Sequence, residues 1–174
     1  SVRAEEDELV RLARRTVESF VRTGETAPLP DKLSDEIQNN RAGVFVSLKI
    51  AGKLRGCIGT ISAVSGSIAE EIVKNAVSAC SEDPRFDPVE PEELERITYS
   101  VDVLGPTERI DSAGQLDVKR YGVIVTSGYR KGLLLPNLEG IDTVEEQIAI
   151  AKKKAGIPAY ERCKLERFEV VRHI

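Results

Sequence analysis

The sequence predicts an α+β fold in which a mostly antiparallel sheet is flanked by helices. Two observations carry this prediction. Helical and strand-like segments do not alternate strictly along the chain, and the most regular strand pattern turns back on itself as a hairpin. A strict strand-helix-strand order would instead indicate a parallel sheet.

Three helices are predicted from apolar residues that recur at helical spacing. Ser67 with Glu70, and Thr143 with Glu146, have the spacing of a capping box at a helix start. A glycine follows the first and the last helix, where a helix commonly ends. The helices are expected over residues 6–22, 67–81 and 143–155.

Strands are predicted where apolar and polar residues alternate. The Ala51-Gly52 pair separates two such runs and predicts a β-hairpin. The stretch 25–36 is expected to be irregular, and the proline-rich stretch 82–95 is expected to lead into a short helix. The strands are expected over residues 44–50, 53–60, 97–104, 121–134 (as two short strands) and 164–174.

The composition indicates which broad class of protein the chain belongs to. With 174 residues, 41% of them hydrophobic and 31% charged, the chain fits one domain, 1–174, with two lobes whose boundary the sequence does not define. The net charge of −4 argues against nucleic-acid binding, and no apolar run is long enough to span a membrane. Three widely spaced cysteines and an acidic first segment, unlike a signal peptide, indicate a reduced, cytoplasmic protein. No metal site or cofactor is predicted, because no ligand spacing or phosphate-loop motif is present.

The stretch GKLRGCIGT, residues 52–60, holds the strongest candidate site. In a regular strand Arg55 and Cys57 share one face, so the guanidinium would favour the thiolate of Cys57 as a nucleophile or redox group. Gly56 and Gly59 would bare the backbone to a ligand or allow a bend. The alternative is a cysteine that only packs, since unpaired cysteines are commonly small apolar core residues.

Other residues support a weaker case for an anion site. Arg85, in the DPRF turn at residues 83–86, either contacts an anionic group or pins its loop through a salt bridge. Lys131 lies between glycines, at a hairpin tip or on one wall of a basic cleft.

Cys80 falls on the apolar stripe of its helix and is expected to pack in the core. His173, the single histidine, lies next to the last residue, which argues against ordinary Cys-His catalysis.

These motifs together resemble the AMMECR domain family, known in bacteria and archaea as AmmeMemoRadiSam system protein A. The resemblance rests on RAGVFVSL (41–48), LRGCIGT (54–60), DPRF (83–86), YSVDVL (99–104), YGVIV (121–125) and GLLLP (132–136). It implies an α+β fold with two lobes, an interlobe cleft lined by the signature strand, and Memo-like and radical-SAM partner proteins. It supplies no established reaction. It implies a site at Arg55, Gly56, Cys57 and Gly59, and extends it to Arg41, Arg85 and Lys131.

The sequence is compatible with three functions. The first is an enzyme or accessory subunit of a modification pathway, in which Arg55, Arg85 and Lys131 bind an anionic group of a ligand or substrate and Cys57 is the nucleophile or redox group. The second is a binding or scaffold module whose cleft holds a peptide or small ligand while Cys57 only packs. The third, nucleic-acid binding, comes last because of the net charge.

Overall fold

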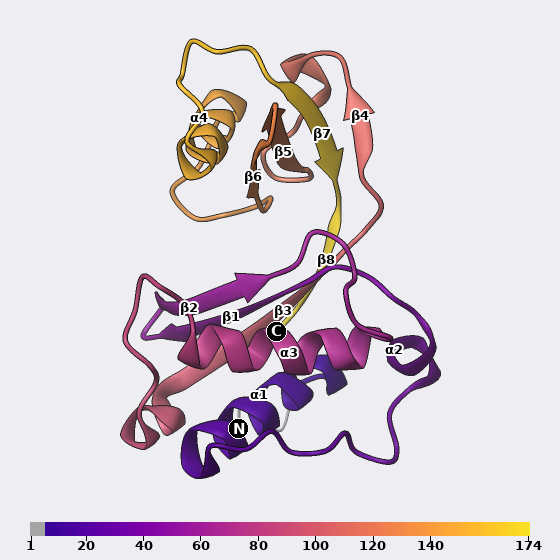
Figure 1. The fold of residues 1–174 in the computed structure, drawn as a ribbon, viewed down its shortest axis with the longest axis vertical. Coiled ribbons are helices and arrows are strands. Elements are labelled where there is room, and N and C mark those ends of the chain that lie inside the picture. The colour runs from indigo at the N-terminus through magenta and orange to yellow at the C-terminus, as the bar shows by residue number, and fades with distance from the viewer. Residues whose placement is uncertain (1–5) are drawn as a thin grey trace. The chain divides into compact units, whose positions relative to one another are not determined.

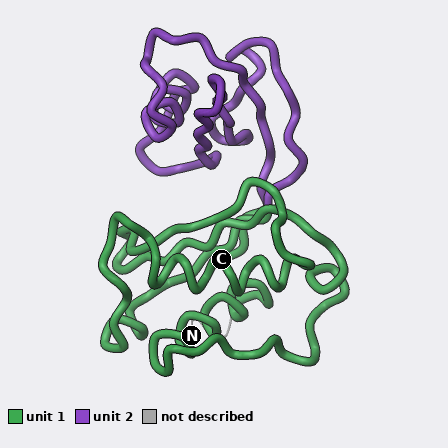
Figure 2. Tube along the Cα trace, viewed as in Figure 1, with its two compact units in different colours: residues 1–103, 171–174 green, residues 104–170 purple. Residues whose placement is uncertain are grey.

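The structure, a computed structural model, describes residues 6–174, and the first five residues of the acidic N-terminal segment lie outside the described part. The chain divides into two compact units, each with its own sheet (Figure 2). Unit 1 comprises residues 1–103 and 171–174, and unit 2 comprises residues 104–170. The α+β prediction is confirmed, with the strands divided between two four-stranded sheets.

Unit 1 is a sheet with its two long helices on one face (Figure 1). The strand order is β2-β1-β3-β8, so β2 is an edge strand. Helix α1 packs on α3, and α3 packs on β1 and β2, burying a core of aliphatic residues from all of these elements. The elements are α1 (Glu8–Thr23), α2 (Asp35–Asn39), β1 (Val44–Ile50), β2 (Lys53–Gly59), α3 (Ile68–Ser81), the 3-10 helix η2 (Pro91–Arg96), β3 (Ile97–Leu104) and β8 (Val170–His173).

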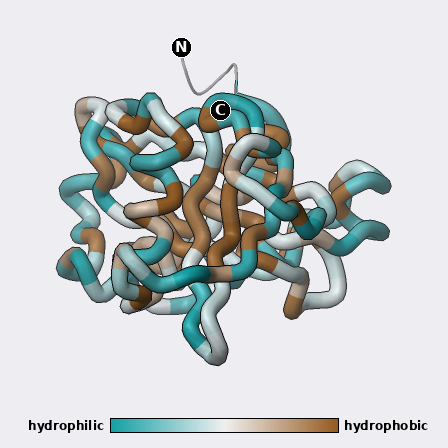
Figure 3. The backbone as a smooth tube through the Cα atoms, turned by 90° about the horizontal axis from the view of Figure 1, so that it is seen from above, coloured by the Kyte–Doolittle hydropathy of each residue, from teal (hydrophilic) through white to brown (hydrophobic). Residues whose placement is uncertain are grey.

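Unit 2 is a smaller sheet covered by one helix. Its strand order is β4-β7-β5-β6, and α4 packs on β5 and β6 around a second apolar core. Figure 3 shows the hydrophobic stretches of the chain, in brown, separated by hydrophilic loops in teal. The elements are β4 (Glu108–Ile110), the 3-10 helix η3 (Ala113–Gln115), β5 (Gly122–Ser127), β6 (Arg130–Leu134), α4 (Val144–Ala155) and β7 (Lys164–Phe168).

Local sequence signals explain most element boundaries. Ser67 accepts a hydrogen bond from the backbone N–H of Glu70 at the start of α3, and Thr143 does the same at α4. Ala51 and Gly52 both have positive φ (50° and 77°), as a type I′ hairpin turn requires. These three predictions are confirmed.

Two predictions of local structure are wrong. The final segment is not one strand: β7 pairs within the sheet of unit 2 and β8 within the sheet of unit 1, with Glu169 between them. The chain changes sheets at this residue, which a run of alternating residues cannot reveal. The segment predicted as irregular over residues 25–36 also contains the start of α2, whose one buried residue is Ile37.

Candidate functional site around Cys57

An irregularity in β2 falls at Arg55. Pairing with β1 begins regularly at the turn and places Leu54 opposite Lys49. The register then shifts, so that the next residue of β1, Leu48, lies opposite Gly56. Arg55 is therefore the extra residue of a β-bulge. The strict alternation expected for this strand fails at this position.

The bulge decides which way Cys57 points. Continued from the turn without the shift, the register would pair Cys57 with Val46, a fully buried residue of the core. With the shift, Cys57 lies opposite Ser47, and side chains of paired residues share a face. Gly56 takes the helix side, where an added Cβ would lie 2.4 Å from the carbonyl oxygen of Ala79 in α3. Cys57 therefore projects from the face opposite the helices.

Arg55 is held by residues that follow α3. Its guanidinium donates to both carboxylate oxygens of Glu93, at 2.8 and 2.9 Å, and to the carbonyl oxygens of Asp87 and Pro88. The hydrogen bond to Glu93 raises the pKa of Arg55, and the same bond lowers the pKa of Glu93. The structure thus gives Arg55 the role of an anchor for the bulge and for the loop before η2.

The DPRF turn covers the open edge of β2 at Cys57. The carboxylate of Asp83 accepts a hydrogen bond of 2.9 Å from the backbone N–H of Cys57, and Arg85 donates to the carbonyl oxygen of Cys57 at 3.2 Å. Arg85 and Asp83 also form a salt bridge of 2.8 Å. An edge strand leaves such backbone groups unpaired, and here two side chains from one turn satisfy both of them. We call Asp83 and Arg85 the edge clamp.

The clamp carries charge beside the thiol. Burial alone would raise the pKa of Asp83, but hydrogen bonds from Arg85 and from the Cys57 N–H outweigh it and lower that pKa to about 2. The hydrogen bond to Asp83 raises the pKa of Arg85, and a negative charge at Cys57 raises it further. The Arg85 side chain is 54% exposed, so its positive charge is accessible to solvent beside Cys57.

Replacing Asp83 with asparagine is expected to lower the free energy of unfolding by about 2 kcal/mol at pH 6, since the pKa falls from 3.8 to about 2. A lowered carboxyl pKa contributes stability above pH 4 that is lost as the pH falls toward 2. The difference in free energy of unfolding between wild type and Asp83→Asn, measured by urea denaturation, should therefore shrink by about 1 kcal/mol from pH 6 to pH 3. A difference that is the same at both pH values would show that the charge of Asp83 does not contribute to stability.

Two serines on the neighbouring strands lie in line with Cys57. The hydroxyl of Ser47 donates to the sulfur of Cys57 at 3.2 Å, and Ser100 of β3 pairs with Ser47 on its other side. The three side chains therefore form a row on one face, with Cys57 partly exposed. Cys80, by contrast, is 2% exposed, and burial raises its thiol pKa to about 11.

A second row lies one pleat further along the same face. It contains Gly59, Phe45 and Asp102, and an added Cβ at Gly59 would meet the ring of Phe45 at 2.2 Å. Arg172 of β8 forms a salt bridge of 2.6 Å with the buried Asp102. Burial raises the pKa of Asp102 despite this arginine. The glycine at position 59 is thus explained by an aromatic ring lying over it.

The remaining predicted residues are Arg41 and Lys131. Arg41 donates to the carbonyl oxygens of Ala63 and Ser65 in the loop after β2. Lys131 is an exposed residue of β6 in unit 2. The structure therefore brings Arg85 to Cys57, directs Arg55 to Glu93 and Arg41 to the loop after β2, and assigns Lys131 to unit 2. The predicted interlobe cleft stays a prediction.

The end of the signature strand is fastened to a buried carboxylate. Glu71 of α3 is fully buried and accepts hydrogen bonds from the Thr60 hydroxyl and from the backbone N–H groups of Val64 and Ser65. Asn75, one turn later, donates to the carbonyl oxygen of Val44 and to the Thr60 hydroxyl. Two polar residues of one helix thus fix where β2 ends.

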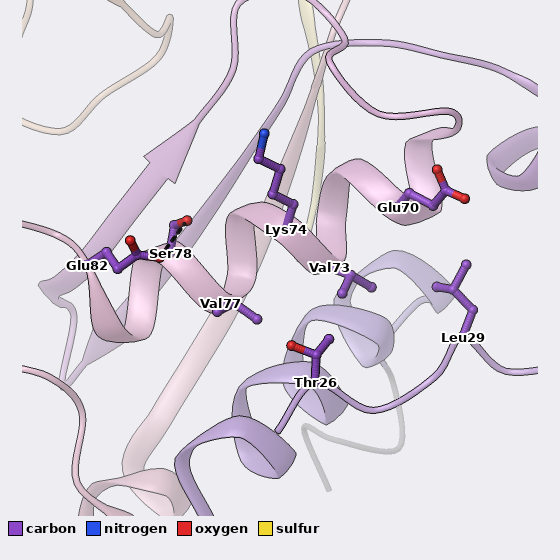
Figure 4. Close-up of a pocket in the computed structure, with 8 residues that line it drawn as sticks. All are labelled: Thr26, Leu29, Glu70, Val73, Lys74, Val77, Ser78 and Glu82. Carbon is purple, nitrogen blue, oxygen red and sulfur yellow. Dashed lines mark hydrogen bonds between the residues drawn. The ribbon is translucent and has the colours of Figure 1, made fainter. Parts of the chain in front are cut away.

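A groove of about 470 Å³ lies on the other side of unit 1 (Figure 4). It is lined by Leu29 and Thr26 of the segment after α1 and by Val73, Val77 and charged residues of α3. Figure 4 shows these side chains on α3 and on the segment after α1. They lie on the helix side of the sheet, whereas Cys57 projects from the opposite face. The groove is therefore separate from the site around the thiol.

Within residues 6–174, no group of three or more histidine, cysteine or acidic side chains could hold a metal ion. His173 bonds to Asp7 at the start of α1. No helix in the described part of the chain is both long and apolar enough to cross a membrane.

Comparison with known proteins establishes the family. The AMMECR1 family matches residues 10–173, almost the whole chain. The chain belongs to the AMMECR1 family. The resemblance drawn from LRGCIGT and its flanking motifs is therefore confirmed.

Relatives within the AMMECR1 family extend the match. A Thermotoga maritima protein is 48% identical over 94% of this chain and 95% of its own length. Protein CA_C1420 of Clostridium acetobutylicum is 51% identical over 99% of this chain, but the chain spans only 37% of that relative's length. The crystal structure of the uncharacterized protein PH0010 from Pyrococcus horikoshii has a TM-score of 0.86 and 35% identity, covering 94% of this chain and 88% of that one.

Proposed function

We propose that this AMMECR1-family chain is a component of a cytoplasmic modification pathway that binds an anionic group of its substrate beside a reactive Cys57. The observation that carries the proposal is the bulge at Arg55, which turns Cys57 out of the core and places it next to Arg85. Bulges are frequent beside active sites, where they re-aim a side chain. A cysteine with only a packing role would be expected on the helix side of the sheet.

The other polar side chains of the signature motif, Arg55 and Thr60, have structural tasks, as do its two inner glycines, which leaves the thiol as the chemical group. Arg55 anchors a loop, Gly56 allows α3 to approach, and Gly59 lies under Phe45. An arginine charge close to a cysteine stabilises the thiolate, which is the nucleophilic form. The partly exposed guanidinium of Arg85 supplies that charge and could attract a carboxylate or phosphate group.

The proposal is tested with a charged and a neutral alkylating reagent. Iodoacetate carries a carboxylate and iodoacetamide does not, so the ratio of their rates at Cys57, divided by the ratio for N-acetylcysteine, measures the attraction for anions. We expect a preference of about fivefold at low salt, from roughly 1 kcal/mol of Coulomb energy, that weakens as salt is added. Arg85→Ala should remove the preference and Arg85→Lys should keep it. A ratio equal to that of the free thiol would contradict the anion site.

A non-catalytic binding module is the second candidate, favoured by the internal hydrogen bonds of Arg55 and Arg41. The family resemblance suggests Memo-like and radical-SAM proteins as partners for either function. Co-purification of such partners with tagged wild-type and Cys57→Ala chains separates the candidates. Equal recovery together with an unreactive thiol would favour the binding module, and the absence of both partners from the wild-type sample would remove the proposed pathway.

A further inference from the structure

One end of unit 2 concentrates positive charge in an acidic protein. Residues 126–131 and 152–164 contain seven basic residues and one acidic residue, whereas the whole chain has a net charge of −4. The acidic residues Glu145 and Glu146 occupy the first turn of α4, and residues 152–154, all lysines, occupy its last turn. The helix is about 18 Å long, so the charges are separated along its length.

A shared ion pair joins the two basic segments. Glu161 accepts hydrogen bonds from Arg130 and from the Ser127 hydroxyl, both at the tip of the β5–β6 hairpin. Arg130 also donates to the carbonyl oxygen of Gly156, at the end of α4, at 3.0 Å. Lys152 donates to the carbonyl oxygens of Ala159 and Glu161. The hairpin tip, the end of α4 and the loop after it therefore form one surface.

Two tyrosines stand on this surface. Tyr129 is 96% exposed and directly precedes Arg130, while Tyr160 is 90% exposed and directly precedes Glu161. Each ring is thus adjacent in sequence to one member of the same ion pair. Gly128 has a φ of 60° at the first position of the turn, as in a type II′ turn, which places Tyr129 at the tip.

Four basic side chains of the same two segments are available to bind a partner. Lys131, Lys153, Arg162 and Lys164 are exposed, and their side chains make no hydrogen bond or ion pair within the part of the chain that the structure describes. Lys131 and Lys164 flank Thr126 on the two neighbouring strands and so lie on one face of the sheet. We call these four residues with Tyr129 and Tyr160 the basic tyrosine surface.

We propose that the basic tyrosine surface binds single-stranded nucleic acid. Such ligands combine phosphates, which bind lysine and arginine, with unpaired bases, which stack on exposed aromatic rings. A duplex hides its base faces, and an acidic peptide offers charge without bases to stack. The net charge of −4 argues against nucleic-acid binding by the chain as a whole, but the negative charge lies outside the two basic segments, which by themselves are strongly positive. The inference is independent of Cys57.

Fluorescence anisotropy of the full chain with a labelled 20-nucleotide oligo-U tests the proposal. Four phosphate contacts predict a salt slope of about −3, so affinity should fall about 50-fold between 50 and 200 mM salt. Tyr129→Ala and Tyr160→Ala should each weaken binding about tenfold, whereas the matched Tyr→Phe variants should bind like wild type. Because both rings are almost fully exposed, the variants should fold, which circular dichroism checks.

Three outcomes would overturn the proposal. One is the absence of binding at 50 mM salt, and another is a Tyr129→Ala/Tyr160→Ala double variant that binds oligo-U as wild type does. The third is binding of a poly-glutamate peptide or of a duplex as tight as that of oligo-U, which would assign the surface to an acidic protein or to backbone charge alone. Oligo-dT in parallel distinguishes DNA from RNA within the proposed class.

Discussion

Replacing Glu71 with alanine is expected to lower the free energy of unfolding by about 4 kcal/mol, the largest loss of stability predicted for unit 1. The change removes a fully buried carboxylate and leaves the Thr60 hydroxyl and the N–H groups of Val64 and Ser65 without their acceptor. The three bonds are only partly buried, but each hydrogen bond to a charged group contributes about 1.5–3 kcal/mol. Urea denaturation followed by circular dichroism measures the difference.

Glu70 provides the matched control for this experiment. It is the preceding residue of α3, but it is exposed and its carboxylate accepts a hydrogen bond from the backbone N–H of Gly66. Glu70→Ala is therefore expected to cost less than about 1 kcal/mol. If Glu71→Ala were as mild as Glu70→Ala, the carboxylate of Glu71 would not organise the end of the signature strand.

Arg55→Ala is expected to lower the free energy of unfolding by about 3 kcal/mol, because breaking a mostly buried ion pair leaves its partner uncompensated. The side chains of Arg55 and Glu93 are only 17% and 19% exposed. The carbonyl oxygens of Asp87 and Pro88 would also lose their donor. The same denaturation experiment applies here.

A comparison of arginine variants shows what the guanidinium contributes. Lysine at position 55 cannot reproduce the paired hydrogen bonds to Glu93, so Arg55→Lys should recover only part of the lost stability. Arg41→Ala, which removes an exposed arginine, should cost less than about 1 kcal/mol. Equal effects at positions 55 and 41 would contradict the anchoring role of Arg55.

Local signals in the sequence predicted most of the fold. The capping residues Ser67 and Thr143 begin their helices as expected, and Ala51-Gly52 forms the hairpin turn. These features depend on a few neighbouring residues, so they can be read from a single chain. The change of sheet at Glu169 depends on which strands pair with β7 and with β8, and those strands are far away in the sequence. The alternation of apolar and polar residues does not identify a strand's pairing partner.

The site was only partly predictable for the same reason. The sequence drew attention to Cys57 and to the DPRF turn, but it paired the thiol with Arg55 through regular alternation. The bulge breaks that alternation, so Ser47 and Arg85 are the neighbours of Cys57. The extra residue of the bulge, Arg55, is held by Glu93, which lies 38 positions further along the chain. A contact between residues so far apart cannot be predicted from the local sequence pattern.

The central claim is that the bulge turns Cys57 onto an accessible face beside Arg85, and alkylation by iodoacetamide at pH 7.5 tests it most directly. Mass spectrometry of partly modified protein gives the rate at each cysteine. Cys80, 2% exposed and with a pKa of about 11, serves as the internal reference. We predict that Cys57 reacts at least about 100-fold faster than Cys80, and several-fold more slowly in Arg85→Ala. A Cys57 that reacts as slowly as Cys80 in the folded protein would place the thiol in the core and contradict the account.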